Sequence, residues 1–349
     1  MVQSSAGLQL QSIRPASTLM EVAPEDIHLL DRYFSTKTMF DVKLGCSEEA
    51  RQILQASLTD PPIRHAVSSL RALRGHLETT GDIAASISVA QQTWSHGCDF
   101  GLQQYCMALG GLASNLSRGS NGLKSALLCC QIFISIEQVR GNHATMIQHV
   151  IQGLSIMHEY RSRPDFAADQ LPLLDVFIVK LFAAPCKFAD PPATADSSGT
   201  MVAVYLTPPQ GQTIESRKFR TIAPDKRTEL TRIASSTLDF LGLLGNMSHV
   251  ESPGNALRLL LSERASLLDS LELWLVDLEL VHSDGPGPIS VSFQRLFHQI
   301  LKIVLMGALN SSPDPYAELR IENDRLLDMA SNIDERVKRA YRMGSGART

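Results

Sequence analysis

The chain has 349 residues, of which 44% are hydrophobic and 19% charged, and its formal net charge is −4. This balance is typical of a soluble globular protein that is long enough to bury one large core or two smaller ones. It excludes a strongly basic surface that would bind nucleic acid over its whole extent.

The first twenty residues contain no basic stretch followed by an apolar run, so we expect no signal peptide. No window of about 18 uninterrupted apolar residues occurs, and we therefore expect no membrane-spanning helix. Aromatic residues make up only 6% of the chain, so its core must be aliphatic. These features favour an all-α fold over a β-sandwich.

Apolar residues recur at helical spacing along most of the chain after residue 24. Ser47 and Asp60 are expected to be N-cap residues, Asp60 directly before a proline at the first helical position. Residues 171–185 are dense in apolar side chains, and although a buried strand is an alternative there, the length favours a helix. We expect helices over these ranges: 25–34, 47–58, 61–77, 98–116, 123–140, 143–160, 171–185, 225–246, 253–282, 289–310 and 315–342.

The chain is organised around residues 123–160, which divide into two amphipathic helical halves at Gly141 and Asn142. Gly141 suits a left-handed C-cap and Asn142 suits an N-cap, so the two helices should fold back as an antiparallel hairpin. Glu137 and Arg140 are spaced to form an ion pair at this corner. They could instead face a partner, but we favour the structural interpretation.

Three short sequence patterns occur in order along the first half of the chain. The first is LLDRYFSTKT followed by ILQASLTDPPIRHAVSSLRAL, the second is FGLQQYCMAL, and the third is EQVRGN followed by HVIQGL. Together they resemble the regulatory region of fungal transcription factors of the zinc binuclear cluster class, over roughly residues 25–190. In that class a helix ending in E-x-x-RGN precedes a helix built on H-x-x-x-G-L.

The resemblance implies a nuclear protein that controls genes transcribed by RNA polymerase II. Many members of the class regulate the genes of a metabolic or secondary-metabolite pathway. It also implies other transcription proteins as partners, homo- or heterodimers, and helix grooves that take a partner helix or a small-molecule effector. No residue can be named as an effector ligand, and we expect no contact with a membrane.

DNA recognition in that class comes from an N-terminal zinc cluster, which needs six cysteines in close C-x2-C pairs within a short basic segment. This sequence also has six cysteines, but they are dispersed at positions 46, 98, 106, 129, 130 and 186. The zinc cluster is therefore absent from this sequence. DNA would be reached only indirectly, or through a zinc cluster encoded upstream.

No residue pattern predicts a catalytic, cofactor or metal site. His143, His149 and His158 lie on one expected helix, but no two of them are four residues apart, which is the spacing that places two metal ligands on one helix face. Cys129 and Cys130 lie in an apolar pattern typical of a packed core rather than of a nucleophile. The glycines at 101, 110 and 111 follow no strand and do not form a phosphate loop. We expect no enzyme activity.

The expected architecture is an irregular array of antiparallel helical hairpins in two parts. Residues 1–24 form a disordered N-terminus, 25–189 the helical regulatory region, 190–215 a proline-rich linker or long loop, and 216–349 a C-terminal helical part that packs on the first. A basic cluster over 217–232 is a candidate for nuclear import. The function predicted from these features is fungal transcriptional regulation. The alternative is a non-catalytic helical adaptor outside transcription.

Overall fold

The structure, a computed structural model, is an array of α-helices and confirms the all-α expectation. It describes residues 22–34, 45–80, 96–115, 120–161, 172–187, 224–246, 253–281, 288–309 and 315–345. No strand occurs within these ranges. The helices are α1 Pro24–Phe34, α2 Ser47–Ser57, α3 Pro61–Thr80, α5 His96–Asn115, α6 Ser120–Val139, α7 His143–Arg161, α8 Leu174–Lys187, α9 Pro224–Asn246, α10 Pro253–Val281, α11 Ile289–Ala308 and α12 Pro315–Ser345.

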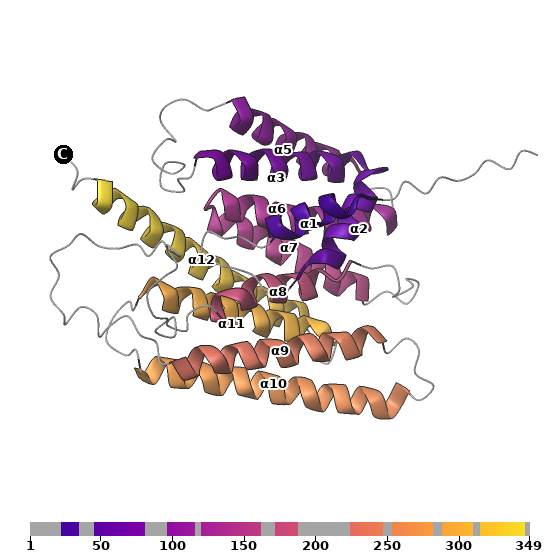
Figure 1. The fold of residues 1–349 in the computed structure, drawn as a ribbon. Coiled ribbons are helices and arrows are strands. Elements are labelled where there is room, and N and C mark those ends of the chain that lie inside the picture. Colours follow the sequence, from indigo (N-terminus) through magenta and orange to yellow (C-terminus); the bar gives the residue numbers. More distant parts are fainter. Residues whose placement is uncertain are drawn as a thin grey trace, which may run out of the picture.

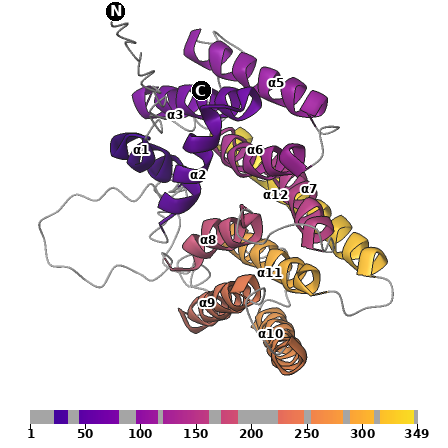
Figure 2. The same cartoon turned by 90° about the vertical axis from the view of Figure 1, so that its right-hand side faces the viewer.

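The helices are stacked in layers from one end of the molecule to the other (Figure 1). The pair α3 and α5 forms one end, and the pair α9 and α10 forms the opposite end, as the rotated view also shows (Figure 2). Between them lie α6 and α7, and then α8 and α11. The long helix α12 runs from α11 to α7 and so joins two layers.

Helix α6 lies at the centre of the core. Within the described part of the chain, its stretch Gly122–Val139 is the one segment long and apolar enough to cross a membrane, but 83% of that stretch is buried inside the protein. Helices α3, α5, α7 and α8 pack around it. Its apolar character is therefore explained by burial on all sides, as expected for a central core helix.

The join between α6 and α7 is tight because the chain makes a left-handed turn at Gly141, whose φ is 67°. The amide of Asn142 donates to the carbonyl of Glu137 at 2.9 Å, and the amide of Gly141 donates to that of Gln138 at 3.1 Å. This pair of bonds is the Schellman motif, which satisfies carbonyls at the end of a helix. The expected hairpin is confirmed, with the glycine at the residue where positive φ is required.

Several helices begin one to three residues from the expected position, among them α5, α6 and α8. Helix α2 has Cys46, not Ser47, at its N-cap, and the Asp31 carboxylate on α1 accepts the Cys46 amide at 2.6 Å. Helix α6 begins at Ser120, three residues before the expected start at residue 123. The helical interpretation of 171–185 is confirmed by α8.

Helices from both sides of the expected linker contact one another. Helix α8 packs on α9, and α7 packs on α12. The linker itself, 190–215, lies outside the described residues, as does the expected disordered segment up to residue 21. The two-part division of the chain stays a prediction.

Gly153 lies where α7 closely approaches α6 and α8, and it gives a first testable prediction. A Cβ atom at this position would overlap Cδ2 of Leu174 and lie 3.3 Å from Cβ of Cys130. Both neighbours are buried, so Gly153→Ala should lower the free energy of unfolding by about 1–3 kcal/mol through overpacking. Urea unfolding followed by circular dichroism measures this.

The matched control is Gly110→Ala on α5, where no atom lies within 4 Å of the added Cβ. In that open site alanine should stabilise the helix by roughly 0.5–1 kcal/mol relative to glycine. Equal effects at the two positions would contradict the close packing of α7 against α6 and α8.

Candidate functional site

The corner of the α6–α7 hairpin brings together the residues singled out from the sequence. Arg140 Nη1 lies 2.6 Å from Glu137 Oε1, and the Glu137 side chain is fully buried. The Arg140 guanidinium also lies 5.8 Å from the centre of the Tyr105 ring on α5. Glu137 therefore lies in the interior, whereas Arg140 lies at the exposed corner and links the end of α6 to α5.

Asn142 precedes α7 and accepts the Met146 amide through its backbone carbonyl at 2.9 Å, as an N-cap residue does. However, the free amides of the first turn are capped from elsewhere. Asp334 on α12 accepts the amides of His143 and Ala144 at 2.9 and 3.0 Å. The sequence predicts a cap by the Asn142 side chain. These amides are instead capped by the Asp334 carboxylate, which lies 190 residues after Ala144 in the chain.

The residues that carry the family resemblance contact one another. His65 of the IRHAV segment lies 2.7 Å from Gln104 of the LQQY segment through Nδ1 and Oε1. The next residue, Tyr105, bonds through its hydroxyl to His149 Nε2 at 2.9 Å. The parts of the three sequence patterns that lie on α3, α5, α6 and α7 thus pack together.

The three histidines of α7 are buried but do not converge. His143 packs edge-on against Phe293 of α11 at 5.3 Å, His149 bonds Tyr105 of α5, and the His158 Nδ1–H donates to the Gly307 carbonyl of α11 at 3.1 Å. Within the described ranges, no group of three His, Cys, Asp or Glu side chains could hold a metal ion. The three histidines each bind α7 to a neighbouring helix.

Cys129 and Cys130 are both buried in α6. Burial raises the pKa of the Cys130 thiol to about 12 and also raises the pKa of Cys129 well above its usual range. A thiol with such a pKa is protonated at neutral pH and is a poor nucleophile. These cysteines act as small apolar side chains of the core.

The structure reveals one hollow that sequence reasoning did not identify. A pocket of about 480 Å³ lies between α10, α11 and α12. Its apolar wall comes mainly from leucines of α10 and from the end of α11, while charged side chains of all three helices line the rest. The lining residues are Arg264, Leu268, Leu271, Glu272, Leu275, His298, Lys302, Met306, Leu309, Glu318, Leu319 and Arg325.

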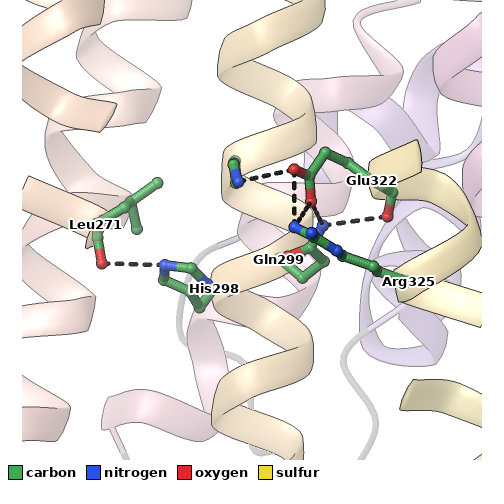
Figure 3. Close-up of polar contacts among 6 residues, drawn as sticks. Leu271, His298, Gln299, Glu322 and Arg325 are labelled. Carbon is green, nitrogen blue, oxygen red and sulfur yellow. Dashed lines mark hydrogen bonds and ion pairs between the residues drawn. The ribbon is translucent and has the colours of Figure 1, made fainter. Parts of the chain in front are cut away.

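One wall of the pocket is held by Glu322 of α12 (Figure 3). Its carboxylate accepts Lys302 Nζ at 2.9 Å, Gln299 Nε2 at 2.7 Å and Arg325 Nη1 at 3.1 Å. Burial alone would raise the pKa of Glu322, but the hydrogen bonds from Lys302 and Gln299 outweigh it and hold this pKa below its usual value. Glu322 therefore fixes two cations at the pocket and couples α11 to α12.

The contact between α11 and α10 at the pocket is fixed by His298 of α11. Its Nε2–H donates to the Leu271 carbonyl of α10 at 3.0 Å, and its ring stacks on Trp274 at 5.5 Å between centroids (Figure 3 shows the bond). Burial lowers the pKa of His298 to about 4, so the ring is neutral at pH 7. The pocket thus has an apolar floor, a neutral imidazole and ion-paired side chains, an arrangement suited to binding a small molecule.

Acid should destabilise the fold through His149 and His298, whose pKa values burial lowers to about 4. In the unfolded chain each of these histidines takes up a proton near pH 6.5, whereas in the folded protein it stays neutral down to about pH 4. The folded state therefore loses stability relative to the unfolded state as the pH falls from about 6.5 toward 4. Between pH 7 and pH 5 we expect a loss of about 2 kcal/mol per histidine. Urea unfolding at the two pH values measures this.

His149→Gln and His298→Gln should each reduce the difference between the two pH values by about 2 kcal/mol. His28→Gln, at an exposed position of α1, should leave the difference unchanged. If both His149→Gln and His298→Gln kept the full pH dependence of stability, the attribution of this dependence to the lowered pKa values of these histidines would be wrong.

The basic cluster is only partly described. Lys226 of α9 bonds Asp277 of α10 at 2.5 Å and lies 3.5 Å from Glu229, and Arg227 is largely buried. Lys226 is therefore part of the packing between α9 and α10, and Arg227 lies in the interior. Arg217, Lys218 and Arg220 lie outside the described residues.

Comparison with known proteins places these features in context. The chain is 64% identical over 347 residues to a protein of Purpureocillium lilacinum named transcription regulator lscL, and the aligned region covers 95% of this chain and 81% of that protein. No model of a protein family matches the chain. No solved structure matches it either.

Proposed function

Since this chain belongs to the family of the transcription regulator lscL and is a fungal transcriptional regulator, we propose that it acts in the nucleus on genes read by RNA polymerase II. The observation that carries the proposal is the 64% identity, which extends over almost the whole chain. The helical array serves in this proposal as a regulatory domain without catalytic activity. The protonated, buried thiols of Cys129 and Cys130 are consistent with that role.

We also propose that the array is the regulatory region typical of zinc binuclear cluster factors. Support comes from the hairpin corner, where EQVRGN forms the glycine turn and the Glu137–Arg140 pair. It also comes from the contacts of His65 with Gln104 and of Tyr105 with His149, which join the three sequence patterns. By this proposal the regulated genes belong to one metabolic or secondary-metabolite pathway.

Contact with DNA is proposed to be indirect, or to use a zinc cluster encoded upstream. The formal net charge is −4, and Lys226, a cation of the basic cluster, is committed to ion pairs within the fold. Sequencing the 5′ end of the transcript separates the two routes. An upstream segment with closely spaced cysteine pairs would establish direct reading of DNA, whereas its absence would establish recruitment through another protein.

The function is tested by transcript profiling of a strain from which the gene has been deleted. We expect expression of one coordinated set of genes to change and to be restored by the wild-type gene. A tagged wild-type protein should be found in the nucleus. An unchanged transcript profile under conditions where the protein is made would overturn the proposal.

The pocket between α10, α11 and α12 is the proposed site of a small-molecule effector. Its volume of about 480 Å³ is within the usual range for small-molecule sites, and it combines leucine side chains with fixed cations. Met306→Trp would fill the pocket from α11. Mass spectrometry of small molecules that copurify with the wild-type protein should reveal a compound that this variant does not retain. Retention of the same compound by both proteins would place the effector elsewhere.

A further inference from the structure

The outer face of α10 is apolar although nothing in the described part of the chain covers it. Leu273, Val276 and Leu280 are 61%, 49% and 74% exposed. The opposite side of the same helix carries Trp274 and Leu278, which are fully buried. Helix α10 lies at one end of the stack and packs mainly on α9 and α11 (Figure 1). A helix that is apolar on two opposite sides is typical of one that packs on both.

The exposed residues have the spacing of a coiled-coil seam. With Leu273 at position a of a heptad, Val276 is at d and Leu280 is at the next a. Glu272 and Glu279 then occupy the two g positions beside the seam, and both are exposed. We call these five residues the acidic seam of α10.

Charge decides which helix can cover the acidic seam. In a parallel pair, g residues face the e residues of the other helix, and in an antiparallel pair they face its g residues. The e residue here is Asp277, which Lys226 binds at 2.5 Å. A second copy would therefore place acid against acid in either orientation, which destabilises a coiled coil. Neither Glu272 nor Glu279 forms an ion pair with another described residue.

We propose that the acidic seam binds an amphipathic helix of a partner protein, with aliphatic residues at its a and d positions and Lys or Arg at the flanking positions. The aliphatic residues would cover Leu273, Val276 and Leu280, and the cations would pair with Glu272 and Glu279. This interaction is separate from effector binding in that its apolar anchors Leu273, Val276 and Leu280 lie outside the pocket, although Glu272 borders both sites. It can be measured on the purified protein without reference to any promoter.

The test uses the full-length protein and two designed helical peptides with leucine at a and d. One peptide has lysine at every e and g position and the other has glutamate. Fluorescence anisotropy should show binding of the lysine peptide at least about tenfold tighter than binding of the glutamate peptide. Glu272→Lys combined with Glu279→Lys should invert this preference.

Leu273→Ser combined with Leu280→Ser should weaken binding of the lysine peptide by about tenfold or more, because two apolar anchors are lost. The matched control is Leu243→Ser combined with Ile321→Ser, at two exposed apolar residues of α9 and α12. This control should bind like the wild type. Circular dichroism checks that all variants keep their helical content.

Three results would overturn the proposal. The first is equal binding of the two peptides, and the second is unchanged binding by the Leu273 and Leu280 variant. The third is a homodimer of the wild-type protein that the same variant converts to a monomer, since the seam would then be occupied by a second copy. Inversion of peptide preference by the charge-reversal variant would support it.

Discussion

Trp274→Ala should lower the free energy of unfolding by about 3–5 kcal/mol, the range for removing a fully buried large aromatic side chain. Trp274 has no exposed surface, and its Nε1–H donates to the Lys226 carbonyl at 2.7 Å. Its ring also stacks on His298. One side chain therefore holds α9, α10 and α11 together next to the pocket, and its loss should loosen all three contacts.

The neighbouring residue provides a sharp comparison for Trp274. Leu273→Ala, at an exposed position of the same helix, should cost well under 1 kcal/mol. Trp274→Phe keeps an aromatic ring but leaves the Lys226 carbonyl without its donor, and should cost about 1–3 kcal/mol. Urea unfolding gives all three values. If Trp274→Ala lowered the free energy of unfolding no more than Leu273→Ala does, this result would contradict the packing of α9 against α10 through Trp274.

Asp334→Ala should lower the free energy of unfolding by about 2–4 kcal/mol. The carboxylate accepts two backbone amides at the start of α7, and bonds of this charge-assisted kind are the stronger ones. It also places a negative charge at a helix N-terminus, where the helix dipole favours it. The substitution leaves the amides of His143 and Ala144 without an acceptor in a largely buried corner.

Hydrogen exchange identifies the site of the Asp334 effect. Protection of the His143 and Ala144 amides should fall in Asp334→Ala and fall less in Asp334→Asn, whose side-chain oxygen can still accept one bond. Asp328→Ala, at an exposed position of the same helix, is the control and should have little effect. Equal effects of Asp334→Ala and Asp328→Ala on stability would show that α12 does not cap α7.

The helices and the central hairpin could be predicted because their signals are local. The apolar spacing of residues 123–160 and the glycine at 141 are sufficient to place α6, α7 and the turn between them. The pair of Glu137 with Arg140 depends only on their spacing along one helix. Local rules work where sequence neighbours are also spatial neighbours.

The sequence did not predict the capping side chain where the acceptor comes from a distant helix. Ser47 is a good N-cap by residue type, but Asp31 of α1 holds the amide of Cys46 instead. Asn142 likewise precedes α7, but Asp334 takes the first amides. Nothing near Asp31 or Asp334 in the sequence signals these bonds, because they depend on how helices pack.

The pocket could not be predicted for a related reason. Its wall combines His298 and Lys302 of α11 with Arg325 of α12 and leucines of α10, and only the packing of three helices brings them together. The one local signal is the excess of apolar residues on α10, which exceeds what one buried face requires. Part of that excess forms the pocket floor, and another part forms the acidic seam.

The central claim is that this protein regulates transcription at promoters. Chromatin immunoprecipitation of the tagged full-length protein from its own fungus tests it most directly, with an untagged strain as control. We predict reproducible enrichment at the promoters of genes whose transcripts change when the gene is deleted. Absence of the protein from both the nucleus and those promoters would contradict the account and favour a helical adaptor outside transcription.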